Sequence, residues 1–195
     1  YHEAIKKKEV IVGVWVRLSF EILTTGLLNG EWEFNEKKAN KAIKFIENFC
    51  HHSEGRSDLL HLELWQKAIV SAIFGVMDKT TGYRQFREVF IIVARKNGKT
   101  LFAAAIAAYM TYVDGEYGAK VYFLAPKLDQ ADLVYDAFYQ IVQSDDELDS
   151  ITKRRRSDIY IKAFNTSVKK IAFNSKKSDG FNPQLVVNDE MEAWP

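Results

Sequence analysis

The chain has 195 residues, of which 47% are hydrophobic and 13% aromatic, and its 27 Lys and Arg nearly balance 26 Asp and Glu. This length suits one ordinary domain, with or without an appendage, that buries roughly 70% of its unfolded surface. The aromatic content and the net charge of +1 exclude a disordered chain. A single cysteine, Cys50, excludes a disulfide framework. No uncharged apolar run reaches the ~18 residues that a membrane span needs, so we expect no membrane association.

The N-terminal part of the sequence predicts a mainly helical leader, residues 1–58. The apolar residues of segment 10–23 fit a strand by their alternation and a helix by the length of the segment. Asn35 is a suitable cap for a helix that runs to about Cys50. The polar stretch 51–58 indicates a loop, and we place the boundary with the main domain there.

The main domain, residues 59–195, alternates between β-rich apolar runs and helical patterns. We expect helices at 62–76, 101–113 and 128–142, strands at 88–94, 119–125 and 185–187, and a hairpin formed by 159–164 and 168–173 around Asn165. In the helix at 128–142, the side chains expected to face inward are Leu133, Val134, Phe138, Ile141 and Val142. This succession is typical of an α/β domain with a mainly parallel sheet.

A candidate phosphate-binding loop lies between the strand predicted at 88–94 and the helix that follows. Gly98, Lys99 and Thr100 open that helix. In such loops, backbone N–H groups at the helix N-terminus surround the phosphates, the lysine reaches the β and γ oxygens, and the threonine hydroxyl contacts Mg²⁺. The strict pattern has a glycine where this chain has Val93, so the loop is a variant. Taken alone, it fits equally well a glycine-containing turn before a helix with an exposed lysine.

A second candidate element is the acidic end of the last apolar run. Asp189 and Glu190 lie at the C-terminal end of the strand predicted at 185–187. Ligands bind at this end of the strands in open α/β sheets. ATP hydrolysis needs one carboxylate to hold Mg²⁺ and another to orient and deprotonate the attacking water. Because side chains alternate along a strand, we expect Asp189 to face the metal and Glu190 to lie near the γ-phosphate. Together with the loop, this pair predicts an ATPase; an ordinary acidic strand end is the alternative.

With several further phrases, these residues resemble the large subunit of tailed-phage terminases, the motors that package viral DNA. The loop ARKNGKT (94–100) lacks the first glycine and carries an arginine, as is typical of that family. Similar phrases are Trp65-Gln66 followed by Ile-Phe-Gly at 73–75, DGEYGAKVYFLA at 114–125, and SDGFNPQLVVNDEMEAWP at 178–195. The resemblance extends from about residue 60 to the end, and the combination of phrases is more specific than any one of them.

The resemblance implies a role for each residue at the catalytic centre of a P-loop NTPase of the RecA-like class. Lys99 and Thr100 would take phosphate and Mg²⁺, and Asp189 would be the acid on the Mg²⁺ side. Glu190 would be the catalytic carboxylate. Arg95 would clamp or sense the γ-phosphate with its planar guanidinium.

The resemblance also implies how the rest of the nucleotide is bound. Trp65 and Gln66 resemble an adenine-recognition element, because an amide both donates to and accepts from the edge of the base. A core tryptophan beside an exposed helical glutamine is the alternative. Lys96, Asn97 and Gly98 complete the expected ATP-binding set.

A basic cluster, Arg154, Arg155 and Arg156, is a further candidate site. Segment 151–188, which contains it, holds nine Lys and Arg and two Asp, whereas 126–150 holds one Lys and seven Asp and Glu. A basic patch can bind a polyanion although the whole chain is nearly neutral. The cluster could contact DNA phosphates or a neighbouring subunit's nucleotide, and a solvated basic turn is equally compatible.

The function that the resemblance implies is that of an ATPase motor domain, which couples Mg-ATP hydrolysis to packaging of double-stranded DNA into a procapsid. The implied partners are a portal protein, the procapsid, a small terminase subunit and further copies in a homo-oligomeric ring, in the bacterial host cytoplasm and transiently at the procapsid. Another nucleic-acid-stimulated ATPase, such as a helicase or restriction-type motor, and a non-functional prophage fragment are the alternatives.

We also expect this sequence to be part of a longer protein that carries an endonuclease domain. In the family, the ATPase core continues past the acidic strand, and a later strand usually inserts between that strand and the phosphate-loop strand. The sheet should therefore be incomplete, without direct pairing between 89–94 and 185–188. Such a fragment would be marginally stable and inactive alone.

Overall fold

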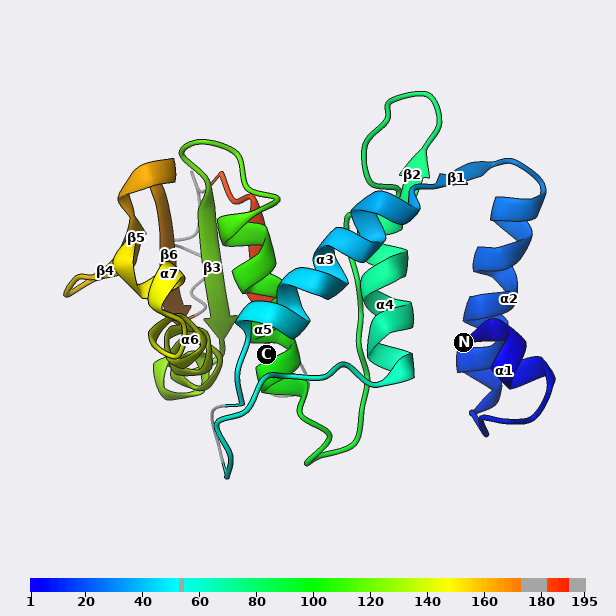
Figure 1. The fold of residues 1–195 in the computed structure, drawn as a ribbon, viewed down its shortest axis with the longest axis horizontal. Helices are drawn as coiled ribbons and strands as arrows, with labels where there is room; N and C mark the ends of the chain where they lie inside the picture. Colours follow the sequence, from blue (N-terminus) through cyan, green and yellow to red (C-terminus); the bar gives the residue numbers. More distant parts are fainter. Residues whose placement is uncertain (53–54, 173–181, 190–195) are drawn as a thin grey trace. The chain divides into compact units, whose positions relative to one another are not determined.

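The computed structural model describes residues 1–52, 55–172 and 182–189 (Figure 1). The chain divides into two compact units. The first contains residues 1–44 and 61–92, and the second contains 45–60 and the described part of 93–195. The leader–core boundary after residue 58 stays a prediction. Within the described ranges, no helix has both the length and the apolar character that a membrane crossing requires.

The first unit is built mainly from helices. Its elements are α1 (His2–Lys6), α2 (Val14–Leu28), α4 (Leu64–Gly75), the greater part of α3 (Glu36–Phe49), and the antiparallel pair β1 (Trp32–Phe34) and β2 (Val76–Asp78). The ambiguous segment 10–23 is therefore helical from Val14 onwards. The predicted cap of α3 is confirmed, since the Asn35 side-chain oxygen accepts the Lys38 N–H at 3.0 Å.

Gly75, which ends α4, allows the closest backbone approach in the first unit. A Cβ at this position would lie 2.6 Å from the Phe34 ring and 2.9 Å from the Ala39 side chain. The Gly75 carbonyl also accepts the Asn35 N–H at 2.7 Å. Any larger residue would therefore push β1 and α3 away from α4, which gives the glycine of the Ile-Phe-Gly phrase a packing role.

The second unit contains a five-stranded sheet with strand order β4-β5-β6-β3-β7. The strands are β3 (Lys120–Ala125), β4 (Thr152–Arg154), β5 (Ile159–Ile161), β6 (Thr166–Ala172) and β7 (Leu185–Asn188). Strand β3 lies between β6 and β7 and pairs in parallel with both, as the apolar runs predict, whereas β4 and β5 extend the sheet with antiparallel pairings. The predicted hairpin around Asn165 is confirmed: a short 3₁₀ turn, η1 (Lys162–Phe164), precedes this residue, whose φ of 51° is left-handed.

Two helices of the second unit, α5 (Lys99–Tyr112) and α6 (Leu128–Gln143), lie side by side (Figure 1). Helix α6 packs on β3 and β6, and α5 packs against α6 and β7. Four of the five side chains predicted to face inward from α6 are buried, namely Val134, Phe138, Ile141 and Val142. Leu133 is 58% exposed, because a residue next to this stripe is rotated about 100° around the helix. The short helix α7 (Asp146–Ser150) and strand β4 were not predicted.

The strand predicted at 88–94 is the main error of the sequence analysis. These residues form no strand in the structure, and Phe90 and Ile92 are 73% and 96% exposed. Strand propensity alone does not make a strand, because the backbone needs a partner that completes its hydrogen bonds. Among the described residues β7 pairs only with β3. The insertion of a later strand between the phosphate-loop strand and the acidic strand stays a prediction.

The buried stripe of α6 gives a stability prediction. Phe138→Ala should lower the free energy of unfolding by about 3–5 kcal/mol, because Phe138 is fully buried between α5, α6 and the sheet. Leu133→Ala on the same helix is the matched control and should change it by less than about 0.5 kcal/mol. Urea unfolding followed by circular dichroism measures both, and equal effects would contradict the observed orientation of α6.

Candidate nucleotide-binding site

The loop that precedes α5 has the backbone conformation of an anion-binding turn. Lys96 and Gly98 have left-handed φ values of 65° and 69°, and the Asn97 side chain donates hydrogen bonds to the Ala94 and Arg95 carbonyls at 3.0 and 3.3 Å. Left-handed residues that alternate with ordinary ones turn successive N–H groups toward one side, which creates a concave site for anions. No atom lies within 4 Å of a Cβ built on Gly98, so the backbone conformation, and not lack of space, requires glycine there.

Helix α5 begins at Lys99 with its N-terminus open. Its N-cap residue is Gly98, which has no side chain that could cap the N–H groups of the first turn. These groups and the helix dipole favour a negative ligand at this position. Thr100 lies in the same turn and is partly exposed, which leaves its hydroxyl accessible.

The sheet brings Asp189 to the same place. Lys99 Nζ lies 3.2 Å from Asp189 Oδ1, although 90 residues separate them in the sequence. Asp189 directly follows β7, and its N–H donates to the Leu124 carbonyl of β3 at 3.1 Å, so the parallel ladder fixes its backbone. The side chains of Lys99 and Asp189 are 36% and 14% exposed. The lysine and the acid, each predicted from a separate motif, thus lie in contact.

The oxygen donors at this point fit the magnesium ion that the sequence analysis predicts. Mg²⁺ is usually bound by one or two carboxylates together with phosphate oxygens and water, and not by a cage of protein ligands. Asp189 already holds one cationic group, the Lys99 ammonium, and Thr100 offers a hydroxyl. In the part of the chain that the structure describes, no cluster of three His, Cys, Asp or Glu could hold a metal. Glu190, the predicted catalytic carboxylate, lies outside the described residues.

The predicted adenine-recognition pair belongs to the first unit, whereas the phosphate loop belongs to the second. Gln66 is only 7% exposed and forms a capping box at the start of α4. Its Oε1 accepts the Glu63 N–H at 2.8 Å, and the Glu63 side chain accepts the Gln66 N–H. The amide oxygen is therefore engaged and the amide nitrogen is the group left to donate to a base. Trp65 beside it is partly buried. Adenine recognition by this pair stays a prediction.

The structure separates the arginines of the basic cluster, which the sequence analysis treated as equivalent. Arg155 donates two hydrogen bonds of 2.6 Å to the carboxylate of Asp158, which is only 4% exposed, and this contact raises the pKa of Arg155. Arg154 lies 3.3 Å from the Asp136 carboxylate and stacks on Tyr139. Arg156 is exposed, as is Arg95 of the phosphate loop. The i,i+3 spacing of Arg155 and Asp158 was the signal that could have revealed their pairing.

A phosphate-type loop that opens a helix, with its lysine in contact with an acid at the end of a parallel strand, is typical of a P-loop NTPase. Residues 64–195 match the family model of the terminase large subunit, ATPase domain. This match covers more than half of the chain, and the chain therefore belongs to this family of viral DNA-packaging ATPases. An ATPase domain takes a nucleotide as its substrate.

The fold agrees with this assignment. It is similar to the crystal structure of the HK97 bacteriophage large terminase, with a TM-score of 0.66 and 24% sequence identity. The similarity covers 77% of this chain and 30% of the HK97 chain, so the present sequence spans less than a third of that relative. No curated protein matches the sequence at a significant level.

The Lys99–Asp189 contact predicts opposite effects of two substitutions on ATP binding in the absence of metal. With EDTA present, Asp189→Asn should bind ATP a few-fold more tightly, because the lysine no longer has to leave a carboxylate. Lys99→Ala should weaken binding by roughly 10- to 100-fold, the loss expected for a charge-assisted hydrogen bond.

Fluorescence anisotropy of a labelled ATP analogue measures both effects. Glu116→Gln is the matched control, since it removes one negative charge near the opposite end of β3 and should leave the affinity unchanged. Weaker binding by Asp189→Asn in EDTA would show that Asp189 and the phosphates of ATP do not compete for Lys99.

Proposed function

We propose that this chain hydrolyses ATP with Mg²⁺ and uses that reaction to translocate double-stranded DNA into a viral procapsid. The observation that carries the proposal is the 3.2 Å contact between Lys99 Nζ and Asp189 Oδ1 at the C-terminal edge of the parallel strands. This contact supports the proposal because a cation suited to phosphate and an acid suited to a metal lie together at the N-terminus of α5. The family match favours DNA packaging over a helicase or restriction-type motor.

Each residue of the site has a separate task in this proposal. The first-turn N–H groups of α5 and the Lys99 ammonium bind and orient the phosphates, and Lys99 exchanges Asp189 for phosphate when the nucleotide binds. Asp189 and Thr100 would hold Mg²⁺, whose charge would neutralise that of the phosphate oxygens. Arg95, exposed in the loop, binds the γ-phosphate. Glu190 orients the attacking water and accepts its proton.

The partners are proposed for the longer protein to which this chain belongs. They are double-stranded DNA, the portal protein of the procapsid, a small terminase subunit and identical copies in a ring, in the host cytoplasm and at the procapsid. An endonuclease activity is proposed for the longer protein, and we assign none of its residues to this chain.

The proposed chemistry predicts distinct losses in two variants of the intact protein. Lys99→Ala should abolish DNA-stimulated ATP hydrolysis because the phosphates lose their cation. Glu190→Gln should also abolish hydrolysis but retain ATP binding, because only the base is lost. Phosphate release and nucleotide binding are measured in parallel, with Lys120→Ala, an exposed lysine at the start of β3, as the control. Turnover by Lys99→Ala at the wild-type rate would refute the assignment of this loop.

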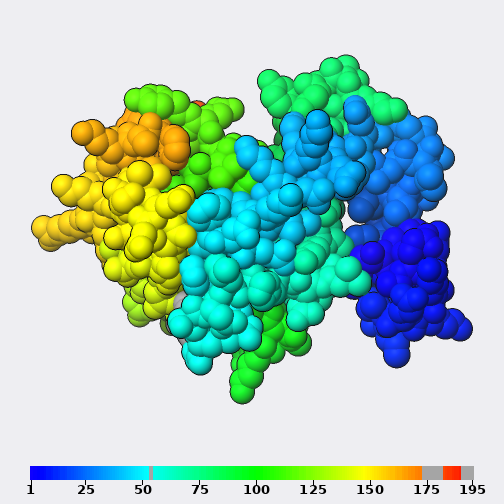
Figure 2. Space-filling view, in the orientation of Figure 1, coloured from blue at the N-terminus to red at the C-terminus, as the bar shows by residue number. Residues whose placement is uncertain are grey.

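The proposed DNA contact is carried by the turn that joins β4 and β5, which projects from the surface (gold in Figures 1 and 2). Arg156, exposed in this turn, is the arginine of the cluster best placed to reach phosphates. Arg156→Gln should lower the slope of log affinity against log salt by about one, because one phosphate contact releases about one counterion.

Arg155→Gln is the comparison for this experiment. It leaves the buried Asp158 without its partner, so it should lower the melting temperature, whereas Arg156→Gln should not. DNA binding is titrated between roughly 50 and 200 mM salt. If the salt slope of Arg156→Gln is unchanged, Arg156 does not contact DNA phosphates and the cluster is a solvated basic turn.

A further inference from the structure

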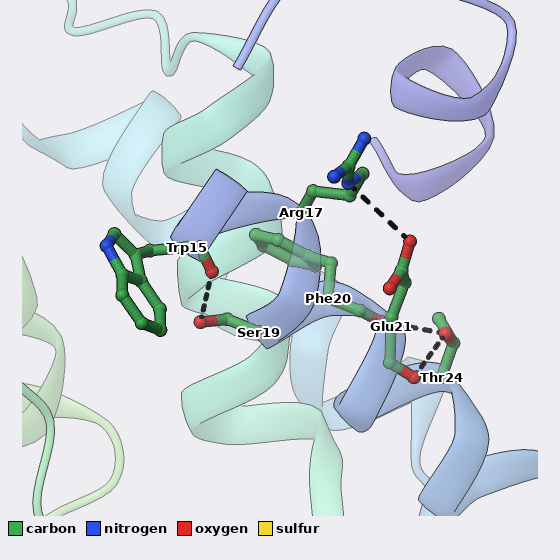
Figure 3. A network of polar contacts seen from close by, with 6 residues as sticks. All are labelled: Trp15, Arg17, Ser19, Phe20, Glu21 and Thr24. Atoms are coloured by element: carbon green, nitrogen blue, oxygen red, sulfur yellow. Dashed lines mark hydrogen bonds and ion pairs between the residues drawn. The ribbon is translucent and has the colours of Figure 1, made fainter. Parts of the chain in front are cut away.

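A side-chain hydrogen bond can hold two elements together only when it joins residues from different parts of the chain. In α2, the Ser19 and Thr24 hydroxyls donate to carbonyls one turn earlier in the same helix (Figure 3). Such contacts stay within one helix and cannot fix its position relative to another element. The Gln184 side chain makes a contact of the other kind, since its Nε2 donates to the Asp114 carbonyl, 70 residues away, at 3.2 Å.

Gln184 and Asp189 flank β7 and contact opposite ends of α5. Each donates its N–H to a carbonyl of β3, at 2.9 and 3.1 Å, so the ladder with β3 fixes both backbones. At the start of α5, the Asp189 carboxylate contacts Lys99. At the other end, the Gln184 amide contacts the Asp114 carbonyl, two residues after the last residue of the helix. Helix α5 is therefore held at both ends by residues of one strand.

The lengths of the two elements make these end contacts sensitive to sliding. Helix α5 has 14 residues and is roughly 21 Å long at a rise of about 1.5 Å per residue. The segment from Gln184 to Asp189 spans about 17 Å at about 3.3 Å per residue. The helix is slightly longer than the strand, and the side chains that meet it close the difference. A shift of α5 along β7 would therefore open one of the two contacts.

The chain is tightly packed where Gln184 meets the end of α5. A Cβ on Gly115 would lie 2.7 Å from the Met110 carbonyl oxygen and 3.5 Å from Gln184 Nε2. The glycine thus lets the chain fold back over the last turn of the helix, next to the Gln184 amide. Gln184 Oε1 is buried and has no hydrogen-bond donor within the described ranges. The amide is enclosed, and its nitrogen is the atom that holds α5.

We infer that Gln184 is a positioning residue for the nucleotide site. By holding the end of α5 to the start of β7, its amide sets the separation of Lys99 from Asp189 about 17 Å away. The same separation governs how Thr100 and Asp189 would share Mg²⁺, because one ligand comes from α5 and the other follows β7. The inference rests on the proposed function of this site and adds a residue that lies outside it.

Coupling between two distant substitutions tests the inference without ATP hydrolysis. In EDTA, Gln184→Leu should tighten the binding of a labelled ATP analogue about two- to fivefold, because a shifted α5 carries Lys99 away from Asp189. Asp189→Asn should then add less than about twofold in the Gln184→Leu background. Substitutions this far apart normally have additive effects. Full additivity of the two would overturn the inference.

The rate of hydrolysis by the intact protein gives a second readout. Gln184→Leu should lower kcat about three- to tenfold at saturating Mg²⁺ and change KM for ATP by less than about twofold, because the metal ligands are misplaced while the phosphates stay bound. Gln184→Lys keeps a donor for the same carbonyl and should restore kcat. An equal loss of kcat in both variants would overturn the inference, since the donor would then be irrelevant.

A matched control separates positioning from stability. Leucine removes the unpaired buried oxygen together with the donor, so Gln184→Leu should keep its melting temperature within about 3 °C of the wild type. Ser144→Ala removes a hydroxyl that donates to the Gln140 carbonyl at the end of α6, at 2.8 Å, and should leave kcat unchanged. A loss of kcat in Ser144→Ala as large as in Gln184→Leu would overturn the inference.

The two assays also separate this inference from the proposed function. A wild-type protein that binds ATP but does not hydrolyse it would refute the proposed function, and the coupling measured in EDTA would still decide the role of Gln184. Normal hydrolysis by both the wild type and Gln184→Leu would reject the positioning role and leave the proposed ATPase intact.

Discussion

The functional part of this molecule depends on the parallel pairing of β7 with β3. That ladder is only four residues long, yet it carries Asp189 to the same edge of the sheet as the N-terminus of α5. Helix α5 packs against β7 and α6, and every residue from Ala104 to Tyr112 is buried. The Ala-rich sequence allows this close packing, because small side chains let a helix approach its neighbours. The position of Lys99 is therefore a consequence of core packing behind it.

The sequence predicts an element correctly where its hydrophobic periodicity and its turn residues agree with the way the element packs in the fold. The strand at 120–125, the helix at 128–143 and the hairpin around Asn165 all combine the right periodicity with turn residues at their ends. The rule that ligands bind at the C-terminal ends of parallel strands predicts the position of Asp189 after β7. The strand expected before Lys99 does not form, and Lys99 reaches Asp189 because α5 packs against β7.

The incorrect predictions have a common physical cause. In each, the structure of a residue or segment depends on a partner elsewhere in the chain that the local sequence does not reveal. Residues 88–94 have strand propensity, but their backbone pairs with no strand in the described structure. Leu133 is apolar, yet nothing covers its side of α6 enough to bury it. Arg155 looks like its basic neighbours, and only the burial of Asp158 reveals that it has a structural task.

The contact between Lys99 and Asp189 also bears on how binding and chemistry are linked. A lysine that is paired with the metal-side acid cannot bind phosphate fully, and an acid that is paired with the lysine cannot bind a metal fully. If Lys99 binds phosphate and Asp189 binds the metal as proposed, binding of either ligand would favour binding of the other, because each would release one partner of the ion pair. Both side chains remain partly exposed, which weakens their pairing and lets a multiply charged nucleotide displace it. In the proposed mechanism, this ion pair would therefore favour the complete metal–nucleotide complex over either component alone.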